Sequence, residues 1–153
     1  MAFFPFSKRK EFFSFDEKER IVEAVRQAEQ QTSGEVRVYT ESRCRFVDPL
    51  DRAAEIFWGL QMDQTKDRNG VLVYVAMQDH QFAIMADQGI HEKVGQAFWN
   101  QEVMVMKKHF VNAHPADAIV AVINDIGQAL KTHFPYDRVN DKNELPDDIV
   151  FGK

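Results

Sequence analysis

Two apolar stretches joined by a short polar turn constrain the fold of this chain most strongly. Residues 70–77 are apolar at almost every position, which is typical of a central strand covered on both faces. Gln78-Asp-His80 then forms a turn into 82–86, which has the length and composition of an antiparallel partner. Such a hairpin brings its two ends together. Asp67, before the first strand, and Asp87, after the second, are therefore expected at the same edge of a sheet.

The rest of the chain supplies one more strand and a set of helices. Alternation of apolar and polar residues predicts the strand, capping signals such as the Ser14 and Glu17 pair mark helix starts, and apolar spacing marks the helix bodies. The strand is expected at 35–41, and helices at 15–31, from Asp48-Pro49 onward, from about Ile90 through Phe110, and from His114-Pro115. A right-handed crossover makes the first two strands parallel. The predicted class is α/β: a three-layer α/β/α sandwich whose small mixed sheet, a parallel pair plus the antiparallel hairpin strand, is flanked by helices.

The length and local composition predict one domain with two appendages. A chain of 153 residues buries roughly two-thirds of its unfolded surface, which is enough for a single core. Residues 1–13 are predicted to be an apolar N-terminal arm, 14–134 the folded domain, and 135–153 an acidic C-terminal tail.

Composition also excludes several classes of function. The net charge of −5 gives a nucleic-acid partner no electrostatic support, and the single cysteine excludes a disulfide framework or a multi-cysteine zinc site.

No stretch approaches the roughly 18 apolar residues of a transmembrane segment. Lys8-Arg-Lys10 follows the apolar N-terminal residues, whereas a signal peptide has its basic residues first. A cytoplasmic protein is the expectation. The absence of every strong catalytic motif shifts weight away from an enzyme.

Carboxylates at the edge that holds Asp67 and Asp87 suggest a cation site. Glu35, at the start of the parallel strand, belongs to the same edge. Calcium takes about six to eight oxygen ligands, and Asn69 with nearby backbone carbonyls would add to the carboxylates. The alternative is structural, with Asp67 shaping a turn and Asp87 capping the helix that follows it.

The opposite edge offers a second acidic and basic group of side chains. The carboxyl ends of parallel strands are where ligands usually bind in open α/β sheets. Asp48 and Asp51 are further candidate metal ligands here, and Arg43 with His80 would supply part of a phosphate-binding set. The alternative is a solvated loop beside a polar turn.

The order of these elements, with four short motifs, resembles the TPM-domain family. The motifs are Thr32-Ser-Gly-Glu-Val-Arg-Val38, Asn69-Gly-Val-Leu-Val-Tyr-Val75, Ala86-Asp-Gln-Gly-Ile90 and His109-Phe110 before a long final helix, and together they span about residues 14–134. The resemblance implies an α/β/α sandwich, divalent-cation binding in some members and a proposed phosphatase activity in chloroplast lumen relatives. Many bacterial relatives add membrane spans and a Gly-rich tail, so this chain resembles a soluble, stand-alone bacterial type. Asp87-Gln-Gly89 departs from the glycine that many relatives have before the last glycine, so a shared site is expected to differ here.

Three hypotheses follow. The first is a cytoplasmic domain that binds a divalent cation, calcium by preference, through Asp67 and Asp87 and secondarily through Glu35, Asp48 and Asp51. The second is a metal-assisted acid phosphatase that uses the same carboxylates. The third is a scaffold that partners a membrane protein through the acidic tail or an exposed tryptophan.

Overall fold

The computed structural model describes residues 12–112, 114–136 and 149–151. Its elements follow one another as α1 (Phe15–Gln30), β1 (Glu35–Glu41), α2 (Pro49–Gly59), β2 (Gly70–Ala76), β3 (Gln81–Ala86), α3 (Gln88–Val94), α4 (Gln96–Val111), α5 (Pro115–His133) and β4 (Val150–Phe151). The predicted arm and tail lie outside the described residues except for 12–13, 135–136 and 149–151. Among the helices in these ranges, none is long and apolar enough to cross a membrane.

The sheet has the strand order β3-β2-β1-β4. β1 and β2 are parallel, with Glu35 opposite Gly70, and β2 and β3 form the antiparallel hairpin, with Val71 opposite Ala86. The predicted parallel pair and hairpin are therefore confirmed. The short strand β4 was not predicted, and it pairs parallel to β1 at Tyr39 and Thr40.

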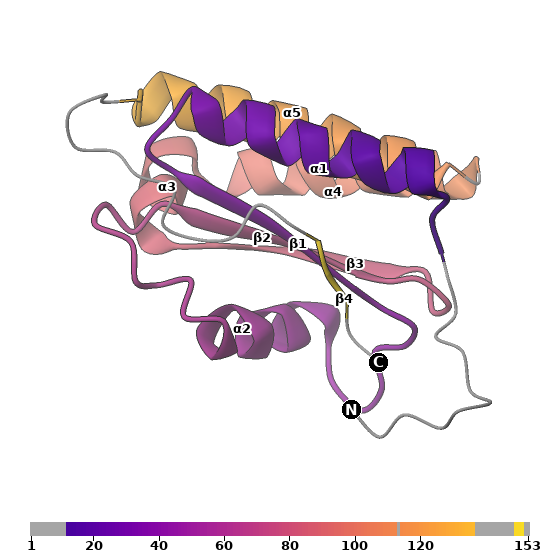
Figure 1. Cartoon of the computed structure of the whole chain (residues 1–153). Coiled ribbons are helices and arrows are strands. Elements are labelled where there is room, and N and C mark those ends of the chain that lie inside the picture. Colours follow the sequence, from indigo (N-terminus) through magenta and orange to yellow (C-terminus); the bar gives the residue numbers. More distant parts are fainter. Residues whose placement is uncertain (1–11, 113, 137–148, 152–153) are drawn as a thin grey trace.

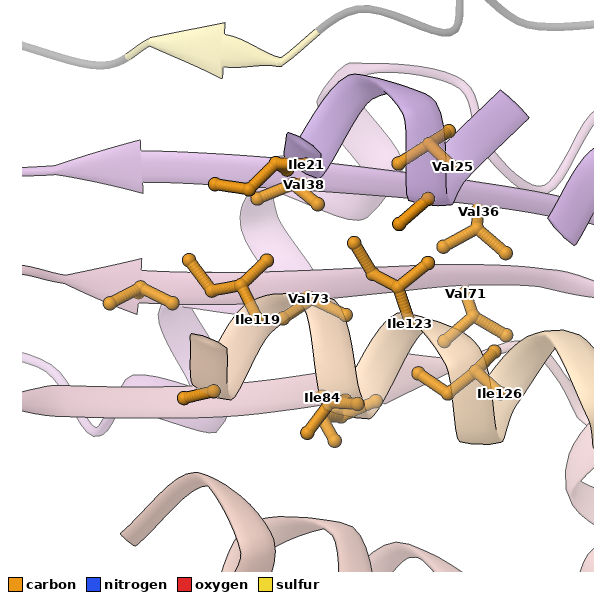
Figure 2. Close-up of a cluster of buried hydrophobic side chains, with 14 of the residues drawn as sticks. Ile21, Val25, Val36, Val38, Val71, Val73, Ile84, Ile119, Ile123 and Ile126 are labelled. Carbon is orange, nitrogen blue, oxygen red and sulfur yellow. The ribbon is translucent and has the colours of Figure 1, made fainter. Parts of the chain in front are cut away.

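Helices cover both faces of the sheet, which confirms the three-layer sandwich (Figure 1). α1, α4 and α5 lie on one face, and α2 lies on the other. Figure 2 shows the larger core, where isoleucine and valine side chains of α1 and α5 meet those of β1, β2 and β3. All seven residues of β2 are buried because side chains on both of its faces meet a helical layer. The apolar run at 70–76 follows directly from this position.

The single helix predicted from about Ile90 through Phe110 is wrong, because the chain breaks it at Gly95. This glycine has φ 79°, a left-handed conformation that side chains with a Cβ rarely adopt, and it ends α3 and precedes α4. The indole Nε1 of Trp99 donates a hydrogen bond to Nδ1 of His91 across the break, at 3.1 Å. The glycine was visible in the sequence, but the apolar spacing continues through it.

The predicted starts of α1 and α2 are confirmed by their caps. The Ser14 hydroxyl accepts from the backbone N–H of Glu17 at 3.1 Å, and the Glu17 carboxylate accepts from the Ser14 N–H at 2.8 Å. Asp48 Oδ1 accepts from the N–H of Leu50 at 2.9 Å, with Pro49 at the first helical position. Each cap satisfies backbone donors that a helix start leaves without partners. The second cap also fixes the residue at which α2 begins, after the loop that follows the carboxyl end of β1.

Candidate functional site

The amino edge of the sheet gathers the segments before β1 and β2 and after β3. The strand registers put Glu35, Gly70 and Ala86 at this edge, so that Asp67 and Asp87 lie in the segments that flank the hairpin there. The Asp87 backbone N–H donates to the Gly70 carbonyl at 2.9 Å, which ties the end of β3 to the start of β2.

Asp87 is a buried carboxylate at this edge, and it is paired with an arginine. It is 3% exposed, and its two oxygens accept from Nε and Nη2 of Arg68 at 2.7 and 2.8 Å. It also caps α3, because Oδ1 accepts from the backbone N–H of Gln88 at 2.8 Å. The hydrogen bond to Asp87 raises the pKa of Arg68 above its ordinary value. Sequence reasoning missed Arg68 as a partner, although an arginine beside Asp67 in the loop facing Asp87 was a usable signal.

The loop before β2 lies directly against the start of α3. The Gly89 N–H donates to the Arg68 carbonyl at 2.8 Å. A Cβ at Gly89 would lie 2.0 Å from the carbonyl oxygen of Asp67 and 2.6 Å from that of Arg68. Only a glycine therefore allows this contact, which fixes the position of Arg68 next to Asp87.

Asn69 is buried in the same loop, with 1% of its surface exposed. Its backbone N–H donates to the Thr65 hydroxyl and its Nδ2 to the Ser33 hydroxyl, both at 3.2 Å. Its Oδ1 is buried and accepts no hydrogen bond from any described residue. A buried amide oxygen without a donor is costly, so this atom is an available ligand for a cation.

The five predicted ligands divide between the two edges. Asp67 is exposed and Glu35 is buried, with the Glu35 N–H donating to the Asn69 carbonyl at 3.4 Å. Asp48 and Asp51 lie at the start of α2, beyond the carboxyl end of β1. Across residues 12–112, 114–136 and 149–151, no three His, Cys, Asp or Glu side chains are grouped so that they could hold a metal ion. A cation site at the amino edge would therefore need oxygen ligands besides carboxylates, from amide groups, backbone carbonyls or water.

At the carboxyl edge, Glu41 is the centre of a buried polar cluster. It is 5% exposed, and it accepts from Nε and Nη2 of Arg52 at 2.9 and 3.0 Å and from the Tyr74 hydroxyl. Burial, and then the hydrogen bond to Glu41, hold the pKa of Tyr74 far above its ordinary value, so the phenol stays protonated. Neither Arg52 nor Tyr74 was predicted, because each lies within a segment that reads as an ordinary helix or strand. His80, which was grouped with Arg43 in the sequence, packs its ring against Phe110 of α4.

Comparisons with known proteins agree with this architecture. The family model described as TPM domain matches residues 7–129. The NMR structure of the BA42 protein from the psychrophilic bacterium Bizionia argentinensis is similar at 39% identity and a TM-score of 0.86, over 95% of this chain and 99% of that one. The N-terminal domain of the cg2496 protein from Corynebacterium glutamicum shares the fold alone, at 15% identity and a TM-score of 0.59, over 78% of this chain and 74% of that one. No curated protein sequence matches significantly. The chain belongs to the TPM-domain family.

Proposed function

We propose that this TPM-domain chain binds a divalent cation, calcium by preference, at the amino edge of its sheet. The observation that carries the proposal is the buried Oδ1 of Asn69, which accepts no hydrogen bond within the described residues and lies in the loop that holds Asp87. Asp87 would supply the anchoring carboxylate, and the exposed Asp67 the second charge. Amide, carbonyl and carboxylate oxygens are the donors that a hard cation prefers.

Arg68 determines how such a cation would bind. Its guanidinium neutralises Asp87 in the protein without metal, so a cation that binds Asp87 has to compete with this arginine. The Arg68 side chain is 35% exposed whereas that of Asp87 is 4% exposed, so the arginine has a route into solvent and the carboxylate does not. Cation binding is therefore expected to be a competition in which the metal displaces Arg68 from Asp87.

Replacement of Asp87 by asparagine tests the proposal. Asparagine keeps the shape and the helix cap but removes the charge, so we expect saturable Ca²⁺-induced amide shifts near 65–70 and 87–89 in metal-stripped wild type to disappear in Asp87→Asn. Two-dimensional NMR spectra recorded during a Ca²⁺ titration give this result. Asp51→Asn is the matched control, because Asp51 is exposed at the other edge, and its titration should equal that of the wild type.

Two outcomes would overturn the proposal. One is a wild-type spectrum unchanged at millimolar Ca²⁺. The other is shifts confined to the start of α2, lost in Asp51→Asn and retained in Asp87→Asn. A generic phosphomonoester assayed with the bound metal then separates binding alone from the metal-assisted phosphatase that the family resemblance implies.

A further inference from the structure

A cleft of about 530 Å³ lies where α3 meets α4 and α5. Because the chain breaks at Gly95, the end of α3 and the start of α4 line it separately, through Lys93 and Phe98. α5 lines it from Asp125 to His133. The volume falls within the roughly 300 to 1,000 Å³ typical of small-molecule sites. The cleft shares no residue with the proposed cation site.

Two carboxyl groups lie close together in this cleft, that of Glu102 on α4 and that of Asp125 on α5. Glu102 is 3% exposed, and its Oε1 is buried and accepts no hydrogen bond from any described residue. Neither carboxyl group forms an ion pair within the described part of the chain. Burying a carboxyl oxygen without a donor is costly, so the protein alone leaves this pair incomplete.

The two basic residues that line the cleft do not supply the missing charge. Burial, and then the carboxyl group of Asp125, raise the pKa of Glu102 to about 8, and neither Lys93 nor His133 reverses this rise. His133 lies two helical turns beyond Asp125 on α5, roughly 12 Å along the helix axis. The end of the cleft at Glu102 and Asp125 therefore offers acceptors and negative charge without a donor.

The lining of the cleft favours an ammonium group over a metal ion. Within residues 12–112, 114–136 and 149–151, no three His, Cys, Asp or Glu side chains are grouped so that they could hold a metal. An ammonium group donates three hydrogen bonds, so two carboxyl groups and one neutral acceptor satisfy it. Gln101 and Gln128 line the cleft and carry such acceptors. Val94, Phe98 and Ala129 line it as well and offer apolar contacts to an alkyl chain.

We propose that this cleft binds a small primary alkylamine, with its ammonium group on Glu102 and Asp125 and its alkyl chain on Val94 and Phe98. The ammonium group takes the place of the proton on Glu102, which leaves to solvent, and donates to the ionised carboxylate. The affinity therefore rises with pH toward the pKa of Glu102, because an alkylamine remains protonated over this range. The other titratable groups that line the cleft are Asp125, Lys93 and His133.

Titration of the ¹⁵N-labelled full chain with n-butylammonium chloride, at constant ionic strength, tests this inference. We expect saturable amide shifts at residues 93–102 and 125–133. The affinity should be about tenfold or more higher at pH 8 than at pH 6, where Glu102 is mostly protonated. n-Butanol, which has the same alkyl chain and no charge, should bind at least about tenfold more weakly at pH 8. Methylammonium should bind several-fold more weakly than n-butylammonium, because it lacks the apolar contacts.

Glu102→Gln separates the ammonium contact from the rest of the cleft. It should weaken n-butylammonium binding at pH 8 at least about tenfold and remove the pH dependence, although Asp125, Lys93 and His133 remain. Glu92→Gln is the matched control, because Glu92 is exposed on α3 beside Lys93 and does not line the cleft. Its affinity and pH dependence should equal those of the wild type.

Four results would overturn the inference. The first is an absence of saturable shifts at tens of millimolar n-butylammonium at pH 8. The second is an affinity that is equal at pH 6 and pH 8, or unchanged in a Glu102→Gln protein whose amide spectrum is otherwise intact. The third is n-butanol binding as tightly as n-butylammonium, which would reduce the cleft to an apolar site. The fourth is tighter binding of Nα-acetyl-lysine methylamide, which would assign the site to a lysine of a protein partner.

Discussion

Replacement of Gly89 by alanine is expected to lower the free energy of unfolding by about 3 kcal/mol, at the upper end of the range for overpacking. The new Cβ would lie 2.0 Å and 2.6 Å from the carbonyl oxygens of Asp67 and Arg68. Because both contacts are with backbone, no side-chain rotation relieves them, and the loop before β2 must move away from α3. The hydrogen bond from the Gly89 N–H to the Arg68 carbonyl would be lost with this movement. Urea unfolding at neutral pH measures the effect.

Gly59→Ala provides the matched control for this substitution. Gly59 is the last residue of α2, and a Cβ there meets no atom within 4 Å. Alanine favours the helix by up to about 1 kcal/mol over glycine, so this variant should be as stable as the wild type or more stable. A Gly89→Ala protein as stable as Gly59→Ala would contradict the close packing of the loop on α3.

Replacement of Glu102 by glutamine is expected to stabilise the protein at pH 8 by on the order of 2 kcal/mol. Glu102 of α4 is 3% exposed, and burial, together with the carboxyl group of Asp125 on α5, raises its pKa from about 4.5 to about 8. Glu102 and Asp125 line the cleft of about 530 Å³ together with Lys93 and His133. These two basic residues do not reverse the rise in the pKa of Glu102. Glutamine has the same shape and carries no charge to bury or to oppose Asp125.

The stabilising effect of Glu102→Gln depends on pH. Between about pH 4.5 and pH 8, the folded protein keeps a proton on Glu102 that the unfolded chain releases. The contribution of this group to stability is therefore complete below pH 4.5 and is lost as the pH rises toward 8. Unfolding measured in urea at pH 5 and pH 8 should show wild type and Glu102→Gln alike at the lower pH and separated at the higher one. Equal differences at both pH values would contradict this. Glu23→Gln, at an exposed pair with Arg26, should change stability little at either pH.

The fold could be predicted because its strongest signals are local. The unbroken apolar run of β2 indicates burial on both faces, and the Ser14 and Asp48 caps mark helix starts through neighbouring backbone groups. The break at Gly95 was missed because apolar spacing on both sides continues as if one helix ran through it. β4 was missed because a two-residue strand has no periodicity, and only its pairing with β1 defines it.

The candidate site could be predicted only in part, because topology places backbone segments and not side chains. The hairpin was enough to bring Asp67 and Asp87 to one edge. It could not indicate that Arg68 neutralises Asp87, since this depends on the left-handed conformation of Arg68, φ 52°, and on the contact of its carbonyl with Gly89. The Glu41, Arg52 and Tyr74 cluster joins residues 11 and 33 positions apart, which no local pattern connects.

The effect of Ca²⁺ on the melting temperature of Arg68→Gln tests the central claim most directly. This substitution leaves the buried Asp87 carboxylate without its cation, so it should lower the melting temperature of the metal-free protein. If a divalent cation binds at Asp87, millimolar Ca²⁺ should raise the melting temperature of the variant by several degrees, and by more than in wild type, where Arg68 competes. The double variant Arg68→Gln/Asp87→Asn should show no such rise. A melting temperature of Arg68→Gln that Ca²⁺ leaves unchanged, or raises equally in the double variant, would contradict cation binding at this edge.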